Sequence, residues 1–215
     1  MDCKYSRREK DKQAREVEIV NAAEKVFFEK GYEGASMDEI AGEAQFTKRT
    51  VYQYFKNKED LYFAVALKWF ERLFSYFEDA LAKGNNGYEK FRLSGLAYFQ
   101  FSKDFPSAFR LLNYCNVIKN NKDISVNFQK MMKVGDIMFQ KFAYTIEEGK
   151  KDGSIRADLD PKMGAYAGVY LSIGFLNIIS EKGEGIEKYH QIKRDDFINY
   201  GLQLLAAAIR NDKIL

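Results

Sequence analysis

The sequence is poor in proline, cysteine and histidine. Its 215 residues include 2 prolines, 2 cysteines and 1 histidine. So few breakers favour long helices over a fold rich in turns. Cys3 and Cys115 form no closely spaced metal motif, so we expect two free thiols in a reducing compartment. We expect no bound metal and no cofactor. A cytoplasmic location follows from the same reasoning.

Long hydrophobic runs are also missing. The first fifteen residues are charged throughout and have no apolar core, so a signal peptide is not expected. Residues 163–179 carry no charge, but 17 residues fall short of the ~20 needed to span a membrane. Gly164, Gly168 and Gly174 also interrupt this run. We interpret the segment as a buried helix and expect no membrane partner.

The net charge of +3 is too small to indicate a nucleic-acid partner by itself. The placement of the charges is more informative. Residues 45–58 contain four bases, Lys48, Arg49, Lys56 and Lys58, and no acid, while residues 3–15 contain six bases against two acids. Local basic segments of this kind are typical of surfaces that bind nucleic acid.

Residues 36–61 have the pattern of two short capped helices followed by the start of a third. Ser36 and Glu39 have capping-box spacing, and Thr47 can begin the next helix. Val51 and Phe55 are four residues apart and should face inward. The polar residues between and around them should face outward: Lys48, Arg49, Thr50, Tyr52, Gln53 and Tyr54. The pattern predicts a helix-turn-helix unit that reads DNA.

The apolar spacing predicts an all-α chain of about nine helices, because no segment alternates like a strand. The expected helices cover about 16–30, 36–43, 47–54, 57–83, 88–103, 105–118, 123–150, 160–180 and 194–211. Gly31 should end the first helix, Asp160-Pro161 should begin the eighth, and a loop around Gly183 and Gly185 should follow it. We expect a basic arm at 1–15, a three-helix DNA-binding domain at 16–56, and a helical ligand-binding and dimerisation domain at 57–215, joined by the long fourth helix.

The last two helices carry a possible dimer surface. Small and large apolar residues form one stripe on the final helix and part of its predecessor: Gly168, Phe197, Gly201, Leu204, Leu205 and Ala208. Two such hairpins could form a four-helix interface between two chains. The alternative is that these faces pack against their own domain.

Residues 16–64 also combine core positions, a helix stop and two caps in one set: Ala22, Ala23, Val26, Phe27, Gly31, Tyr32, Ser36, Ile40, Ala41, Ala44, Thr47, Val51, Tyr52, Tyr54, Phe55, Lys58, Glu59, Asp60 and Leu61. Together these residues resemble the TetR family of bacterial transcriptional regulators. The rest of the chain is similar in organisation only, including the stretch 151–161 before the expected dimer helices. The resemblance implies a homodimer that binds a palindromic operator.

The resemblance also implies roles for individual residues. Base edges would be contacted by Lys48, Arg49, Thr50 and Gln53, and phosphates by Ser36, Thr47, Tyr52, Tyr54 and Lys58. Tyr52 and Tyr54 could instead brace the core. The basic segment could add backbone contacts as a flexible arm or could be a solvated tail. Two residues depart from the family pattern: Gln45 stands where glycine is usual in the turn, and Arg49 stands where a small residue is common.

An effector pocket is expected from the resemblance rather than from spacing, since most aromatic residues at helical spacing belong to ordinary cores. Its candidate residues are Trp69, Tyr98, Phe101, Phe109, Tyr114, Met131, Phe142 and Tyr170. We expect a small apolar or amphipathic ligand that releases a repressor from its operator. The alternatives are a helical enzyme or a protein-interaction bundle. An enzyme is disfavoured because His190, in an expected loop, is the single histidine and no catalytic motif accompanies it.

Overall fold

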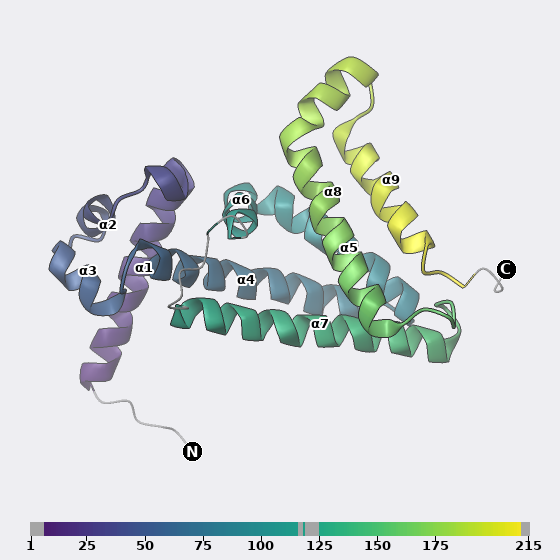
Figure 1. The fold of residues 1–215 in the computed structure, drawn as a ribbon, viewed down its shortest axis with the longest axis horizontal. Helices are drawn as coiled ribbons and strands as arrows, with labels where there is room; N and C mark the ends of the chain where they lie inside the picture. The colour runs from purple at the N-terminus through teal and green to yellow at the C-terminus, as the bar shows by residue number, and fades with distance from the viewer. Residues whose placement is uncertain (1–6, 116–117, 119–124, 212–215) are drawn as a thin grey trace. The chain divides into compact units, whose positions relative to one another are not determined.

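The computed structural model describes residues 7–115, 118 and 125–211. Its helices are α1 (Arg7–Gly34), α2 (Met37–Glu43), α3 (Lys48–Tyr54), α4 (Lys58–Lys83), α5 (Gly87–Asp104), α6 (Pro106–Tyr114), α7 (Val126–Asp152), α8 (Pro161–His190) and α9 (Arg194–Ala207) (Figure 1). Apart from an isolated bridge between Ile155 and Arg210, the described residues contain no β structure. The all-α prediction is therefore confirmed.

The chain forms two compact units. The first contains residues 1–70 and 107–133, and the second contains residues 71–106 and 134–215. Both α4 and α7 begin in the first unit and end in the second. These units divide the chain differently from the predicted domains, because α6 and the start of α7 cluster with the N-terminal helices.

The core of the first unit is built by α1, α2, α3, the start of α4 and part of α6. Its buried residues include Ile19, Ala23, Val26, Phe27, Ile40, Ala41, Val51, Phe55, Leu61, Tyr62, Val65, Ala66 and Leu111. Tyr62 donates a buried hydrogen bond to the Leu111 carbonyl at 2.8 Å. Tyr114 donates to Glu33 at 2.9 Å. These two contacts attach α6 to helices α4 and α1.

Helix α1 is longer than predicted at its N-terminal end. It begins at Arg7, so the part of the basic segment between residues 7 and 15 is helical rather than a flexible arm or disordered tail. Residues 1–6 lie outside the described part of the chain. Near the other end, Gly31 has φ 70° and ψ 179°, which kinks the helix. The predicted helix stop therefore lies at the right residue, although helical hydrogen bonding resumes as far as Gly34.

In the second unit, α8 also differs from the prediction. It continues through Gly183 and Gly185 to His190, where a loop was expected. Each glycine costs a helix about 1 kcal/mol relative to alanine, which two extra turns of hydrogen bonds can offset. A Cβ added at Gly183 would lie 3.0 Å from Arg194 Cδ, so the glycine makes room for the start of α9. Gln191, at φ 55°, ends the helix in the left-handed conformation.

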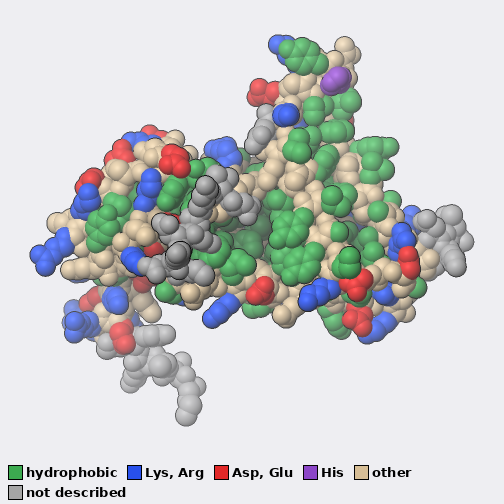
Figure 2. All heavy atoms as spheres, viewed as in Figure 1, with side chains coloured by type: hydrophobic (Ala, Val, Ile, Leu, Met, Phe, Trp, Pro, Cys, Tyr) green, Lys and Arg blue, Asp and Glu red, His purple; other side chains and the backbone are tan. Residues whose placement is uncertain are grey.

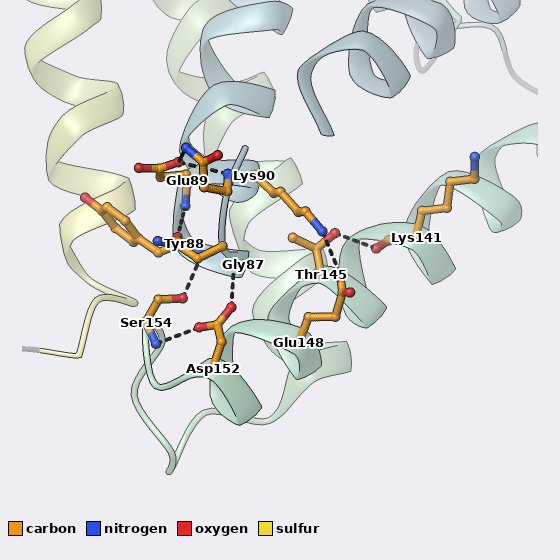
Figure 3. A network of polar contacts seen from close by, with 11 residues as sticks. Gly87, Tyr88, Glu89, Lys90, Lys141, Thr145, Glu148, Asp152 and Ser154 are labelled. Atoms are coloured by element: carbon orange, nitrogen blue, oxygen red, sulfur yellow. Dashed lines mark hydrogen bonds and ion pairs between the residues drawn. The ribbon is translucent and has the colours of Figure 1, made fainter. Parts of the chain in front are cut away.

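Small residues allow close helix packing within the second unit. A Cβ added at Gly87 would lie 2.3 Å from the backbone of Gly149 on α7. The same region contains a polar network (Figure 3), in which the Gly87 N–H donates to Asp152 at 2.9 Å and the Tyr88 N–H donates to Ser154 at 3.1 Å. Asp152 at the end of α7 and Ser154 just after it thus satisfy backbone donors at the start of α5, which would otherwise lack partners.

Candidate nucleic-acid interface

Side-chain caps fix the starts of the two short helices α2 and α3. Ser36 Oγ accepts a hydrogen bond from the Glu39 N–H at 3.2 Å, and the Ser36 N–H donates to Glu39 Oε2 at 3.0 Å, which forms the predicted capping box. Thr47 Oγ1 accepts from the Thr50 N–H at 3.2 Å and lies 2.9 Å from Thr50 Oγ1. The hydroxyls of Ser36, Thr47 and Thr50 are therefore already engaged locally.

The turn between α2 and α3 has the geometry of a Schellman motif. Gln45 has φ 57°, its N–H donates to Gly42 O at 3.1 Å, and the Phe46 N–H donates to Ala41 O at 2.9 Å. These are the two hydrogen bonds that close such a helix end. Gln45 thus adopts the left-handed conformation for which glycine is usual, and the turn keeps its shape despite the side chain.

Helix α3 has one buried and one exposed face, as predicted. Val51 and Phe55 are 0% and 1% exposed and anchor the helix to the core. Arg49 and Gln53 are exposed, and Tyr52 is 46% exposed. Tyr54, in contrast, is half-buried and packs against the core cluster. The structure therefore places Tyr52 on the outer surface and supports a bracing role for Tyr54.

Two basic side chains expected to contact DNA have partners within the chain. Lys48 Nζ lies 2.7 Å from Asp38 Oδ2 on α2. Lys58 Nζ donates to the Tyr32 carbonyl at 2.7 Å and to the Ala35 carbonyl at 3.0 Å, and lies 4.4 Å from the centre of the Tyr32 ring. The structure does not support the predicted phosphate contact of Lys58, because its ammonium faces carbonyls at the end of α1.

The ion pairs that join α1 to α2 could not be assigned from the sequence. Lys25 contacts Glu43 at 2.8 Å, and Lys30 contacts Glu39 at 2.5 Å. The hydrogen bond from Lys30 is the largest cause that lowers the pKa of Glu39. Glu39 thus serves both the cap of α2 and its attachment to α1.

Residues 19–65 match the model of the bacterial regulatory proteins of the tetR family. The matched segment contains the caps, the turn and the amphipathic α3 described above. The N-terminal domain belongs to the TetR family. The family and the relatives that the chain matches are transcriptional regulators rather than enzymes.

Curated relatives match this chain over different lengths. The chain is 34% identical over 95 residues to the transcriptional activator FasR of Mycolicibacterium smegmatis, covering 44% of this chain and 43% of the relative. It is 32% identical over 83 residues to the negative transcriptional regulator IcaR of Staphylococcus epidermidis, covering 39% and 42%. These matches span less than half the length of either relative. A transcriptional regulator of Bacillus subtilis, YhgD, matches 74% of this chain and 80% of its own length at 25% identity.

Solved structures extend the likeness in fold to nearly the whole chain. A TetR/AcrR-family regulator from Thermobifida fusca has a TM-score of 0.66 at 22% identity, covering 92% of this chain and 99% of that chain. The regulator FadR from Bacillus subtilis, solved with stearoyl-CoA, has a TM-score of 0.68 at 19% identity, covering 90% and 99%. At these identities the comparison shows the fold alone.

The eight residues expected to line an effector pocket are divided between the two units. Trp69, Phe109, Tyr114 and Met131 belong to the first unit, and Tyr98, Phe101, Phe142 and Tyr170 belong to the second. Phe101 and Phe142 are 0% and 4% exposed, and burial raises the pKa of Tyr98. These three residues belong to the buried core of the second unit. Tyr170 is 62% exposed and stacks on Tyr166.

The second unit has an open groove of about 470 Å³ that the sequence did not reveal. It is lined by Leu81, Lys90, Ile137, Gln140, Lys141, Tyr144, Thr145 and Glu148. Lys90 crosses it to reach Glu148 at 3.0 Å, and Thr145 donates to the Lys141 carbonyl (Figure 3). Its volume lies within the range of small-molecule sites. None of the eight expected residues lines it.

Several residues expected at a dimer interface pack within their own chain. A Cβ at Gly168 would lie 2.4 Å from the Phe91 ring, and one at Gly201 would lie 2.3 Å from the Phe175 ring. Phe197 also packs against Phe175, with 5.7 Å between ring centres. These contacts support the alternative of packing within the domain for Gly168, Gly201 and Phe197. Of the other three predicted residues, Leu204 is 56% exposed, Ala208 is exposed and Leu205 is half-buried.

The outer face of α8 is apolar and exposed, so the prediction of a buried helix was wrong. Figure 2 shows hydrophobic side chains gathered along α8. Its exposed members include Met163, Tyr166, Tyr170, Leu171 and Ile178, at 74%, 38%, 62%, 56% and 57%. By length and composition alone Pro161–Ser180 could cross a membrane, and 22% of that window is buried. Ala165, Leu176 and Ile179 lie on the opposite, buried face of the helix.

Proposed function

We propose that this chain is a ligand-responsive transcriptional regulator that binds operator DNA as a homodimer in the cytoplasm. The observation that carries the proposal is the exposed polar face of α3, held by Val51 and Phe55 and preceded by the capped α2. A short helix anchored in this way can enter the major groove and present side chains to base edges. Arg49 and Gln53 are the exposed residues best suited to direct reading, and Tyr52 suits a phosphate contact.

DNA binding is tested with a fragment of the gene's own upstream region against random DNA at several salt concentrations. A specific regulator binds the fragment more tightly and loses affinity steeply as salt rises. Arg49→Ala should relax the preference at one base pair in each half-site. Arg110→Ala, at an exposed arginine on α6, is the matched control and should leave the preference unchanged. Equal binding to all sequences by the unmodified protein would reject the proposal.

The dimer is supported by the exposed apolar face of α8 together with Leu204 on α9. A contiguous apolar surface of this kind on a folded chain usually marks an interface. Two recognition helices related by a two-fold axis can enter successive major grooves, which explains why an operator would be palindromic. Tyr170→Glu combined with Leu204→Glu should convert the dimer to a monomer in sedimentation velocity. Val17→Glu, at an exposed apolar residue of α1, should leave the dimer intact; a monomeric unmodified protein would contradict the assignment.

We further propose that a small apolar or amphipathic effector binds the second unit and releases a repressor from its operator. The groove beside Lys90 and Tyr144 is the candidate site, because it combines apolar walls with ionic groups. FadR was solved with stearoyl-CoA, and AibR, another protein of similar fold, was solved with isovaleryl coenzyme A and operator DNA, which makes acyl-CoA thioesters the first probes. The relatives include both an activator and a negative regulator, so the operator-binding test also has to establish the direction of regulation.

The effector is tested by titrating acyl-CoA thioesters of short and long chains into the protein with and without operator DNA. If the effector releases DNA, operator DNA must weaken effector binding by the same factor, because coupling is reciprocal. Gln140→Trp should fill the groove and abolish the response. Gln129→Trp, on the same helix but outside the groove, is the control. Saturation by a ligand with no change in operator affinity would remove the allosteric part of the proposal.

A further inference from the structure

An acid on α2 holds the first residue of the recognition helix. Lys48 Nζ lies 2.7 Å from Asp38 Oδ2, and the two side chains are 49% and 67% exposed. The hydrogen bond to Asp38 is the largest cause that raises the pKa of Lys48. Exposed ion pairs of this kind contribute at most a small amount to folding stability. A contribution to folding stability therefore does not explain why Asp38 and Lys48 are paired.

The position of Asp38 is unfavourable for binding DNA as such. It belongs to the first turn of α2, within contact distance of α3, whereas residues 45–58 contain no acid. A carboxylate beside the recognition helix repels the phosphate backbone of any sequence. It also occupies a lysine that could otherwise neutralise a phosphate. Asp38 thus weakens the part of the affinity that does not depend on sequence.

The contact with Asp38 also restricts the positions that the Lys48 ammonium can occupy. Lysine is a compact charge on a flexible four-carbon stem, and its three donors suit a phosphate from many angles. When one donor is held by Asp38, two remain, and the stem is restricted to the side of α3 that faces α2. A lysine restricted in this way can donate to the O6 and N7 acceptors of a guanine.

We propose that Asp38 is a specificity-determining residue, which holds Lys48 for reading a guanine edge and keeps it from gripping phosphates. This inference rests on the proposed function, because it requires that α3 enter the major groove. Asp38 acts through Lys48 and is a positioning residue. Its effect is on the ratio of operator affinity to random-DNA affinity.

The test compares Asp38→Asn with the unmodified protein on operator and random DNA over a range of salt concentrations. Asparagine keeps the shape and removes the charge. Random-DNA binding should strengthen several-fold and operator binding less, so that the ratio falls roughly five-fold, the low end for one base contact. The salt slope on random DNA should steepen by about 1, since the released lysine neutralises one further phosphate.

Glu43→Gln is the matched control. Glu43 is an acid at the other end of the same helix and pairs with Lys25 on α1 at 2.8 Å. Removing its charge should change both affinities by the same factor. In a Lys48→Ala background, Asp38→Asn should also strengthen both DNAs equally and leave the ratio unchanged, because the residue through which Asp38 acts is missing.

Two results would overturn the inference about Asp38, and a third would reject the proposed function. Equal strengthening on both DNAs by Asp38→Asn in the presence of Lys48 overturns the inference, since general repulsion alone explains it. A fall in the ratio that persists without Lys48 also overturns it. A titration of the Lys48 side chain by NMR without DNA should show a lower pKa in Asp38→Asn; that result with no operator preference in the unmodified protein would reject the proposed function while confirming the ion pair.

Discussion

Gln45→Gly should stabilise the protein, although it removes a side chain. Gln45 has φ 57°, and a non-glycine residue in this conformation carries roughly 1–2 kcal/mol of steric cost. Glycine avoids that cost, but it gains more freedom in the unfolded chain, which offsets roughly 0.5–1 kcal/mol of the benefit. The side chain is exposed and anchors nothing in the core. The net gain should be about 1 kcal/mol, or about 2–4 °C in the melting temperature of a chain of this size.

The melting temperature is measured by circular dichroism at 222 nm with two comparison variants. Gln191→Gly, at φ 55° where α8 ends, tests the same effect at a second position and should also raise the melting temperature. Gln13→Gly lies in the exposed helical part of α1 and should lower stability by up to about 1 kcal/mol. A loss for Gln45→Gly similar to that for Gln13→Gly would refute the reasoning, because it would mean that the turn stores no steric cost.

Three further predictions concern buried or internally bonded groups of the first unit. Lys58→Met should lower the free energy of unfolding in urea by roughly 1.5–3 kcal/mol, because two carbonyls lose a charged donor, and the salt slope of DNA binding should stay unchanged if Lys58 contacts no phosphate. Tyr62→Phe should cost roughly 1–2 kcal/mol in the same assay, since the buried Leu111 carbonyl loses its hydroxyl donor; an unchanged midpoint would show that the bond contributes nothing. Burial raises the pKa of the Cys115 thiol to about 12, so in a Cys3→Ser background alkylation at pH 8 should be slow until the protein is unfolded. Rapid alkylation of the folded protein would contradict that burial.

The sequence predicted best the features that depend on neighbouring residues. The cap of α2 at Ser36 and the cap of α3 at Thr47 each follow from chemistry within three or four positions. Helix ends of this kind are local, because the orphan backbone groups must be satisfied close by. The inward positions Val51 and Phe55 follow from the helical period.

The sequence could not identify the partner of a residue when that partner lies far away along the chain. Lys58 was expected on a phosphate, but two carbonyls at the end of α1 take its ammonium. Gly168 and Gly201 were expected to face another chain, but rings of the same unit fill the space that their missing side chains leave. A glycine in the sequence indicates that another group packs closely against the helix, but it does not identify that group. Local pattern therefore predicts a helix and its faces, and the partner of each face has to come from the structure.

The DNA specificity that we propose depends both on residues of α3 and on a contact between residues far apart in the sequence. The exposed residues of α3 can be named from the helical period, and Arg49 and Gln53 among them can be assigned to base edges by chemistry. Lys48 cannot, because its role depends on Asp38, ten residues earlier and on another helix. A change at Asp38 would leave every residue of α3 unchanged and still alter what the helix reads. Two chains with the same recognition helix can therefore prefer different operators, and the contact between α2 and α3 is where such a difference should be sought.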